Sequence, residues 1–105
     1  MLLQQGDILV KNINAFPGNL SIVVPVDNRL IIAKGEATGH CHVINDINNV
    51  QLLKDKDGNL FLDVKKTTDL IHQEHNPILI EPGKYRIDIV REYDHFEEKV
   101  RGIED

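Results

Sequence analysis

The segment VQLLKDKDGNLFLDV, residues 50–64, decides the fold because its pattern is typical of two short strands around a tight turn. Asp57-Gly58, near its centre, suits a hairpin turn in which the backbone must adopt positive φ. From Leu60 to Val64, leucine and valine recur at every second position. This spacing predicts a strand with one buried face.

Short apolar runs separated by turn residues continue on both sides of this hairpin. They are GDILV, SIVVPV and RLIIAKGEA before it, and TDLIH and NPILIEPGKYRIDIVREY after it. Pro25 indicates an edge strand or a strand end, and Asp27-Asn28 favours a tight turn. The last run is typical of two strands joined by a turn at Pro82-Gly83. The chain is therefore predicted to be all-β, a small antiparallel β-barrel or sandwich.

The C-terminal segment has a different pattern. Apolar residues from Tyr93 to Ile103 recur at offsets of three, four and three, which is the spacing of a helical stripe. Asp94 is a suitable N-cap for that helix. We therefore predict one C-terminal helix at about residues 94–103.

Length and charge limit the function classes. With 105 residues the chain is expected to be a single domain, residues 1–105. The formal net charge is −5, so a nucleic acid is not an expected partner, since such partners favour basic surfaces. The start of the chain lacks the pattern of a signal peptide, and no run of about 20 apolar residues predicts a membrane span. Together with the single cysteine, Cys41, this indicates a cytoplasmic protein without a membrane partner.

Assembly is a further expectation from the same pattern. An edge strand near Pro25 and an apolar helical stripe at the C-terminus would leave apolar surface uncovered in a single copy. We therefore expect a homodimer that buries that edge or that helix.

Histidines supply the main candidate site. In GEATGHCHVI, residues 35–44, His40 and His42 are two positions apart, so on a strand both side chains lie on one face and Cys41 on the other. In IHQEHNP, His72 and Glu74 would share a face if the segment is extended, and Pro77 favours a bend near His75.

Together the two segments predict a metal site. The expected ligands are four imidazoles, and Glu74 is a further ligand or a general base; the imidazoles are His40, His42, His72 and His75. Imidazole suits zinc, iron, nickel and copper, and an incomplete protein set leaves a position for water or substrate.

The segment GEATGHCH, followed at a distance by a Pro-Gly-aromatic turn, resembles a reduced cupin motif. Matched residue by residue, Gly35 takes the place of the leading glycine, and His40 and His42 take the places of the paired ligands. Asp46 stands where that motif has a glutamate, and Tyr85 where a ligand histidine is expected. The resemblance implies a β architecture and a metal site. The wider pattern also looks like a compact family of small, uncharacterised bacterial proteins.

Three functions remain open at this point. The first is a metal-binding β-barrel, including the case of a metal-dependent enzyme acting on a small-molecule substrate. The second is a metal-independent phosphodiesterase or nuclease in which two histidines act as acid and base. The third is a non-enzymatic interaction or accessory module whose histidines only fill hydrogen-bond positions.

Overall fold

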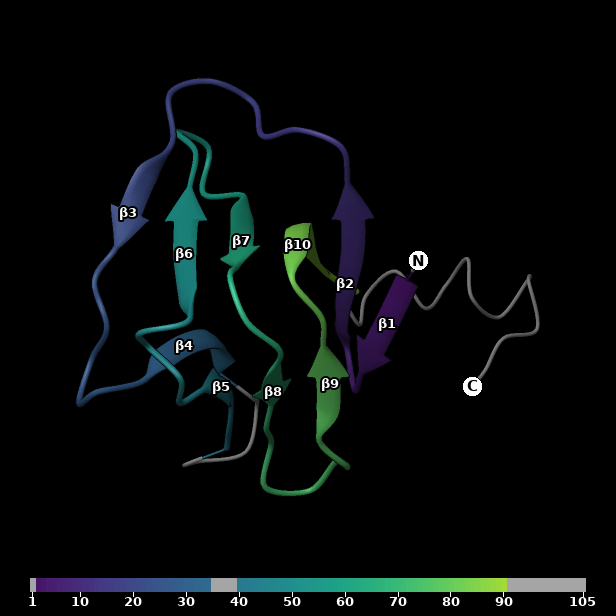
Figure 1. Cartoon of the computed structure of the whole chain (residues 1–105). Coiled ribbons are helices and arrows are strands. Elements are labelled where there is room, and N and C mark those ends of the chain that lie inside the picture. The colour runs from purple at the N-terminus through teal and green to yellow at the C-terminus, as the bar shows by residue number, and fades with distance from the viewer. Residues whose placement is uncertain (1, 35–39, 91–105) are drawn as a thin grey trace.

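The computed structural model describes residues 2–34 and 40–90, and every regular element in that part of the chain is a β-strand (Figure 1). The strands are β1 (Leu2–Gln5), β2 (Ile8–Ile13), β3 (Ser21–Val23), β4 (Leu30–Lys34), β5 (Cys41–Ile44), β6 (Val50–Lys54), β7 (Leu60–Val64), β8 (Thr68–Leu70), β9 (Ile78–Ile80) and β10 (Gly83–Ile89).

The main element is a six-stranded antiparallel sheet in the order β1-β2-β10-β7-β6-β3. Strands β6 and β7 form the hairpin predicted from residues 50–64, with Leu52 opposite Leu62. Gly58 has a φ of 89°, as the turn requires. The tight turn at Asp27-Asn28 is also confirmed, since Val26 and Arg29 form a bridge across it. Strand β10 lies between β2 and β7, so it joins the two ends of the described chain into one sheet.

Two smaller antiparallel pairs, β4-β5 and β8-β9, lie together at one end of the molecule (Figure 1). A bridge between Val43 and Ile71 connects them, with backbone hydrogen bonds of 2.9 Å in both directions. The end of β8 is therefore fixed beside the middle of β5. The bridge also brings His42 close to His72, because these two histidines are the chain neighbours of the bridged residues.

One hydrophobic core holds the pairs against the sheet. Val10, Leu62 and Ile87 from the sheet are buried in the same cluster as Ile44 and Leu70 from the small pairs. Fully burying a leucine or isoleucine side chain contributes about 1.5–3 kcal/mol. The shared cluster is therefore a main source of the attachment between the two layers.

The antiparallel all-β prediction is confirmed, but the described strands do not close into a barrel. The six-stranded sheet is open, with β1 and β3 as its edges. Strand β3 has only three residues, and Pro25 follows it without a backbone N–H to donate, so pairing stops there. The predicted helix at 94–103 lies outside the described residues. Within residues 2–34 and 40–90 there is no helix with the length and apolar character needed to cross a bilayer.

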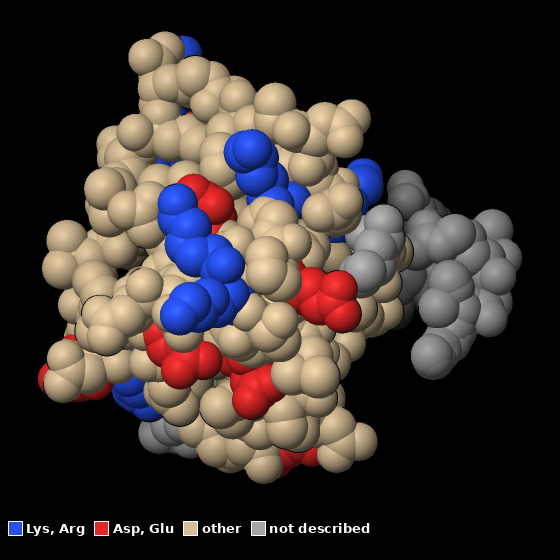
Figure 2. Space-filling view, in the orientation of Figure 1, with Lys and Arg blue, Asp and Glu red and all other residues tan. Residues whose placement is uncertain are grey.

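Charges of both signs lie close together on the surface. Figure 2 shows lysine and arginine side chains over the middle of one face, with aspartate and glutamate side chains beside and below them. Two pairs bridge directly, Lys65 to Asp63 at 3.2 Å and Arg86 to Asp88 at 3.0 Å. The edge around β3 is different, since Ile22, Val24 and Val26 are exposed there.

Candidate functional site

Four histidines from the two predicted segments come together at the end of the molecule that holds the small strand pairs. The ring centroids of His42 and His72 are 4.3 Å apart, and those of His72 and His75 are 4.7 Å apart. His40 lies 5.7 Å from His72 by the same measure. Residues 30 or more positions apart in the chain therefore meet in one cluster, here called the histidine cluster.

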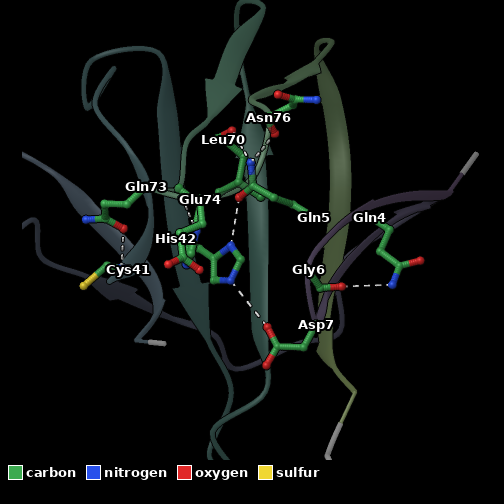
Figure 3. Close-up of polar contacts among 11 residues, drawn as sticks. Gln4, Gln5, Gly6, Asp7, Cys41, His42, Leu70, Gln73, Glu74 and Asn76 are labelled. Atoms are coloured by element: carbon green, nitrogen blue, oxygen red, sulfur yellow. Dashed lines mark hydrogen bonds and ion pairs between the residues drawn. The ribbon is translucent and has the colours of Figure 1, made fainter. Parts of the chain in front are cut away.

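The strand pairing explains this convergence. His42 lies on β5, directly before Val43, which is bridged to Ile71, and His72 follows Ile71. The Gln73 side chain then accepts a hydrogen bond of 2.9 Å from the Cys41 backbone N–H, which holds the next part of the chain against β5. Cys41 points away from His42, as the alternation of a strand predicts (Figure 3).

The segment from His72 to Asn76 bends at residues 73–75, so the extended arrangement in which His72 and Glu74 would share a face is not formed. The Glu74 backbone N–H donates to His72 Nδ1 at 3.0 Å, which turns the chain at that point. The Glu74 carboxylate is mostly exposed and lies 3.6 Å from His40 Nδ1. Glu74 and His40 therefore form the outer edge of the cluster, while the bend near His75 is as predicted.

A turn between β1 and β2 adds a segment that the sequence analysis did not assign to the site. Gly6 in this turn has a φ of 58°, a conformation that glycine adopts far more readily than other residues. A Cβ atom on Gly6 would lie 2.6 Å from His75 Nε2. A side chain at this position would therefore displace the His75 ring, so glycine is needed here for two reasons.

Gln5 is buried and connects the three parts of the site (Figure 3). Its Nε2 donates to the carbonyl oxygens of Leu70 at 2.8 Å and Asn76 at 2.9 Å. Both partners are acceptors, so the amide orientation is determined, and its Oε1 faces His42 Nδ1 at 2.8 Å. His42 must then carry a proton on Nδ1, because an amide oxygen can only accept.

The other nitrogen of His42 faces a carboxylate. His42 Nε2 lies 3.4 Å from Asp7 Oδ1, on the side of the ring away from Gln5 (Figure 3). Burial is the main cause that lowers the pKa of His42 below its ordinary 6.5, and the neighbouring His72 and His75 act in the same direction. The Asp7 carboxylate raises that pKa but does not outweigh them. At neutral pH, His42 Nε2 therefore carries no proton, and its lone pair is directed at a second acceptor, the Asp7 carboxylate.

The nitrogen and oxygen atoms that could bind a metal ion are near one another but do not converge on one position. Among residues 2–34 and 40–90, no group of three or more His, Cys, Asp or Glu side chains is arranged so that it could hold a metal ion. The rings of His42 and His75 are nearly parallel, at 11°, with centroids 6.1 Å apart. Asp46, matched above to the cupin glutamate, instead accepts a hydrogen bond of 2.8 Å from the Thr68 hydroxyl. The cupin resemblance therefore has no support in the fold or in this contact.

Sequence reasoning missed Gln5 and Asp7. The available signal was the stretch QGD at residues 5–7, a glycine turn flanked by two polar side chains just before an apolar strand. Nothing in that stretch indicates which distant residues its side chains contact, so the partners become visible only in the fold.

Comparison with known proteins assigns the chain to a family. No curated protein and no solved structure matches the chain. The match is to a family model described as "Domain of unknown function (DUF8820)", and it spans residues 4–90, from the strand that carries Gln5 to the end of β10. The chain therefore belongs to the DUF8820 family, a family without an assigned function.

Proposed function

We propose that this protein binds a divalent transition metal ion in the histidine cluster, with His42 Nε2 and Asp7 as the first two ligands. The observation that carries the proposal is the pair of facing acceptors, His42 Nε2 and Asp7 Oδ1, 3.4 Å apart. With the proton of His42 on Nδ1, no hydrogen bond can form between them. A cation between the two atoms would turn a repulsive contact into two favourable ones.

The spacing of this pair favours zinc. With Zn–N of about 2.0–2.1 Å and Zn–O of about 2.0–2.2 Å, two ligand atoms on a tetrahedral zinc ion are roughly 3.4 Å apart. Ligand atoms at right angles on an octahedral ion, at similar bond lengths, would be only about 3.0 Å apart. Zinc is therefore the best match, with iron, nickel and copper as weaker ones.

His75 is the candidate third ligand. Two imidazoles on one tetrahedral zinc have ring centroids roughly 5 Å apart, so the His42–His75 distance of 6.1 Å requires a modest approach of the two rings. The Gln5 side chain supports His42 as a ligand, because metal-bound histidines usually donate their other ring N–H to an acceptor. The fourth position would then take water or a small-molecule substrate, and the exposed Glu74 would serve as a general base if the site is catalytic.

The test is a zinc titration of untagged protein, followed by calorimetry and by elemental analysis after desalting. We expect one ion per chain, with His42→Ala and Asp7→Asn each weakening binding by about 100-fold or more, since both remove ligands. Asp57→Asn, at an exposed aspartate in the β6–β7 turn, is the matched control and should leave affinity unchanged. If neither zinc nor cobalt binds the folded protein at micromolar concentration, the proposal is wrong.

A second candidate is a metal-independent acid–base pair, and the short distance between two rings favours it. His42 Nε2 is an acceptor, whereas His72 Nδ1 accepts from Glu74, so a neutral His72 carries its proton on Nε2. His42 would be the base, and His72, with its ring 4.3 Å away, would be the acid only as an imidazolium, which would no longer accept the hydrogen bond from Glu74. Phosphodiester cleavage that survives a strong chelator and is lost in both His42→Ala and His72→Ala would favour this candidate over the metal site.

A further inference from the structure

We propose that two copies of this chain pair through strand β3 and form a dimer with one continuous antiparallel sheet. Strand β3 is an edge of the six-stranded sheet and carries no residue of the histidine cluster, so the proposal is independent of the metal site. The two copies are related by a two-fold axis, and each β3 lies antiparallel to the β3 of the partner.

Strand β3 is paired on one side only. Ser21, Ile22 and Val23 lie opposite residues of β6. No described strand pairs with the other side of β3, which is the outermost strand at the left of Figure 1. The backbone N–H and C=O groups on that side are therefore open to a further strand. The side chains at this edge are also accessible, since Ile22 is 61% and Val24 73% exposed.

The chain around this edge carries no charge. Residues 12–26 contain no Asp, Glu, Lys, Arg or His, and this is the longest such stretch in the sequence. Edge strands are commonly protected by charged side chains, because a charge is costly to bury against another strand. That protection is absent here. A partner with charges opposite this stretch would have to bury them, whereas a second copy presents only uncharged side chains to it.

The register of the sheet gives a second argument for an identical partner. Phe61 lies opposite Leu53, and Leu53 lies opposite Ile22, so these side chains form a row on the face turned away from the core cluster. Phe61 and Leu53 are buried, and the Phe16 ring packs edge-on against Phe61. The row ends at the exposed Ile22. An isoleucine from the partner, at the same position across the axis, would continue the apolar row.

The middle of β3 is the expected position of the axis. With the axis at Ile22, Ser21 of each copy lies opposite Val23 of the other, so the whole strand is paired. Because this arrangement uses the β3 edge of both copies, the assembly closes at two. Interfaces of standard size involve about 20–30 residues a side, and this edge offers fewer. We therefore expect a weak dimer, with a Kd of roughly micromolar order.

The first experiment is sedimentation of the untagged full chain over a range of concentrations. We expect a monomer–dimer equilibrium, and Ile22→Lys should raise its Kd by about 10-fold or more, because two like charges would face each other in the interface. Ile22 is exposed in a single copy, so the variant should fold, as circular dichroism would verify. Leu79→Lys, at a residue of β9 that is 64% exposed, is the matched control and should leave the equilibrium unchanged.

The second experiment tests the register by disulfide cross-linking with oxidised glutathione, in a Cys41→Ser background that removes the native thiol. Ile22→Cys places two thiols directly opposite each other, within the Cα separation of about 4.4–6.8 Å that a disulfide needs. We expect a covalent dimer. Val24→Cys should not link, because its two copies would be offset by four positions, roughly 13 Å along the strand.

Three results would overturn the proposal. One is a wild-type chain that stays monomeric up to about 100 micromolar. Another is a dimer that Ile22→Lys does not weaken, and its loss in Phe96→Lys would then move the interface to the apolar C-terminal pattern. The third is a Val24→Cys variant that links as readily as Ile22→Cys, which would rule out an antiparallel pairing centred on Ile22.

Discussion

Two turns that contain a glycine, β6–β7 and β1–β2, are held by different kinds of hydrogen bond. In the β6–β7 turn, the Asp55 carboxylate accepts hydrogen bonds from the backbone of Asp57 and from the backbone and side chain of Asn59. All of these partners lie within four residues. In the β1–β2 turn, Gln5 is hydrogen-bonded to residues far along the chain, and the His75 ring fills the space that a Cβ atom on Gly6 would take. The first turn is a local structure, and the second is a meeting point of distant segments.

The largest expected difference between the turns is the loss of stability when the side chain that makes most of the hydrogen bonds, Gln5 or Asp55, is removed. Gln5→Leu would leave the Leu70 and Asn76 carbonyls and His42 Nδ1 without the partner they have now. Each buried polar group that loses its partner costs about 1–3 kcal/mol. We therefore expect Gln5→Leu to lower the free energy of unfolding by about 3 kcal/mol or more, as measured by urea denaturation.

Asp55→Ala is the counterpart in the local turn and should cost clearly less than Gln5→Leu, because water can replace part of the lost hydrogen bonds at that half-buried position. Gln4→Leu, next to Gln5 but exposed, should change stability by less than about 0.5 kcal/mol. If Gln5→Leu were no more harmful than Gln4→Leu, the two turns would not differ as we describe.

The glycines themselves give a smaller and more specific comparison. Both have positive φ, so alanine is strained in either turn, at a cost of roughly 1–2 kcal/mol. Only at Gly6 does the new Cβ meet another residue, His75 Nε2, since at Gly58 nothing lies within 4 Å. We expect Gly6→Ala to be the more destabilising of the two by thermal denaturation, and to shift the NMR signals of His75. Equal effects on stability, with His75 unmoved, would contradict the contact.

The smallest expected effect is the response to pH. The pKa of His42 is lowered from 6.5, so its contribution to stability is complete above that pH and declines as the pH falls from 6.5 through the lower folded pKa. The pKa of Asp55 is lowered from 3.8, chiefly by the hydrogen bond from the Asn59 side chain, so its contribution is lost only below 3.8. Amide protection factors, in which the intrinsic pH dependence of exchange is removed, should therefore fall near His42 between pH 7 and 5 and stay constant near Asp55, and the reverse pattern would argue against a buried neutral His42.

The same difference between local and long-range contacts explains which features could be predicted from the sequence. The β6–β7 hairpin was predictable because Asp57-Gly58 and the alternating leucines act locally. The approach of the two histidine segments was predictable from residue types alone, although the bend at His72 was not, since it depends on a backbone N–H bonding to a ring. The roles of Gln5 and Asp7 were out of reach because they depend on which strands lie side by side. The choice between a barrel and a sandwich stayed open, because alternation alone does not indicate where pairing stops, and the six-stranded sheet is open.

The three hydrogen bonds of Gln5 also set an order of events in time. They connect Gln5 to residues 37, 65 and 71 positions away, so the complete set can form only after the chain has been synthesised as far as Asn76 and has folded back. A hairpin such as β6–β7 forms in about 1–10 microseconds, whereas contacts between distant segments form later, since loop closure must come first. The histidine end is therefore expected to assemble last. An ion that needs Asp7 and His42 together would be captured by the finished protein and not by the growing chain.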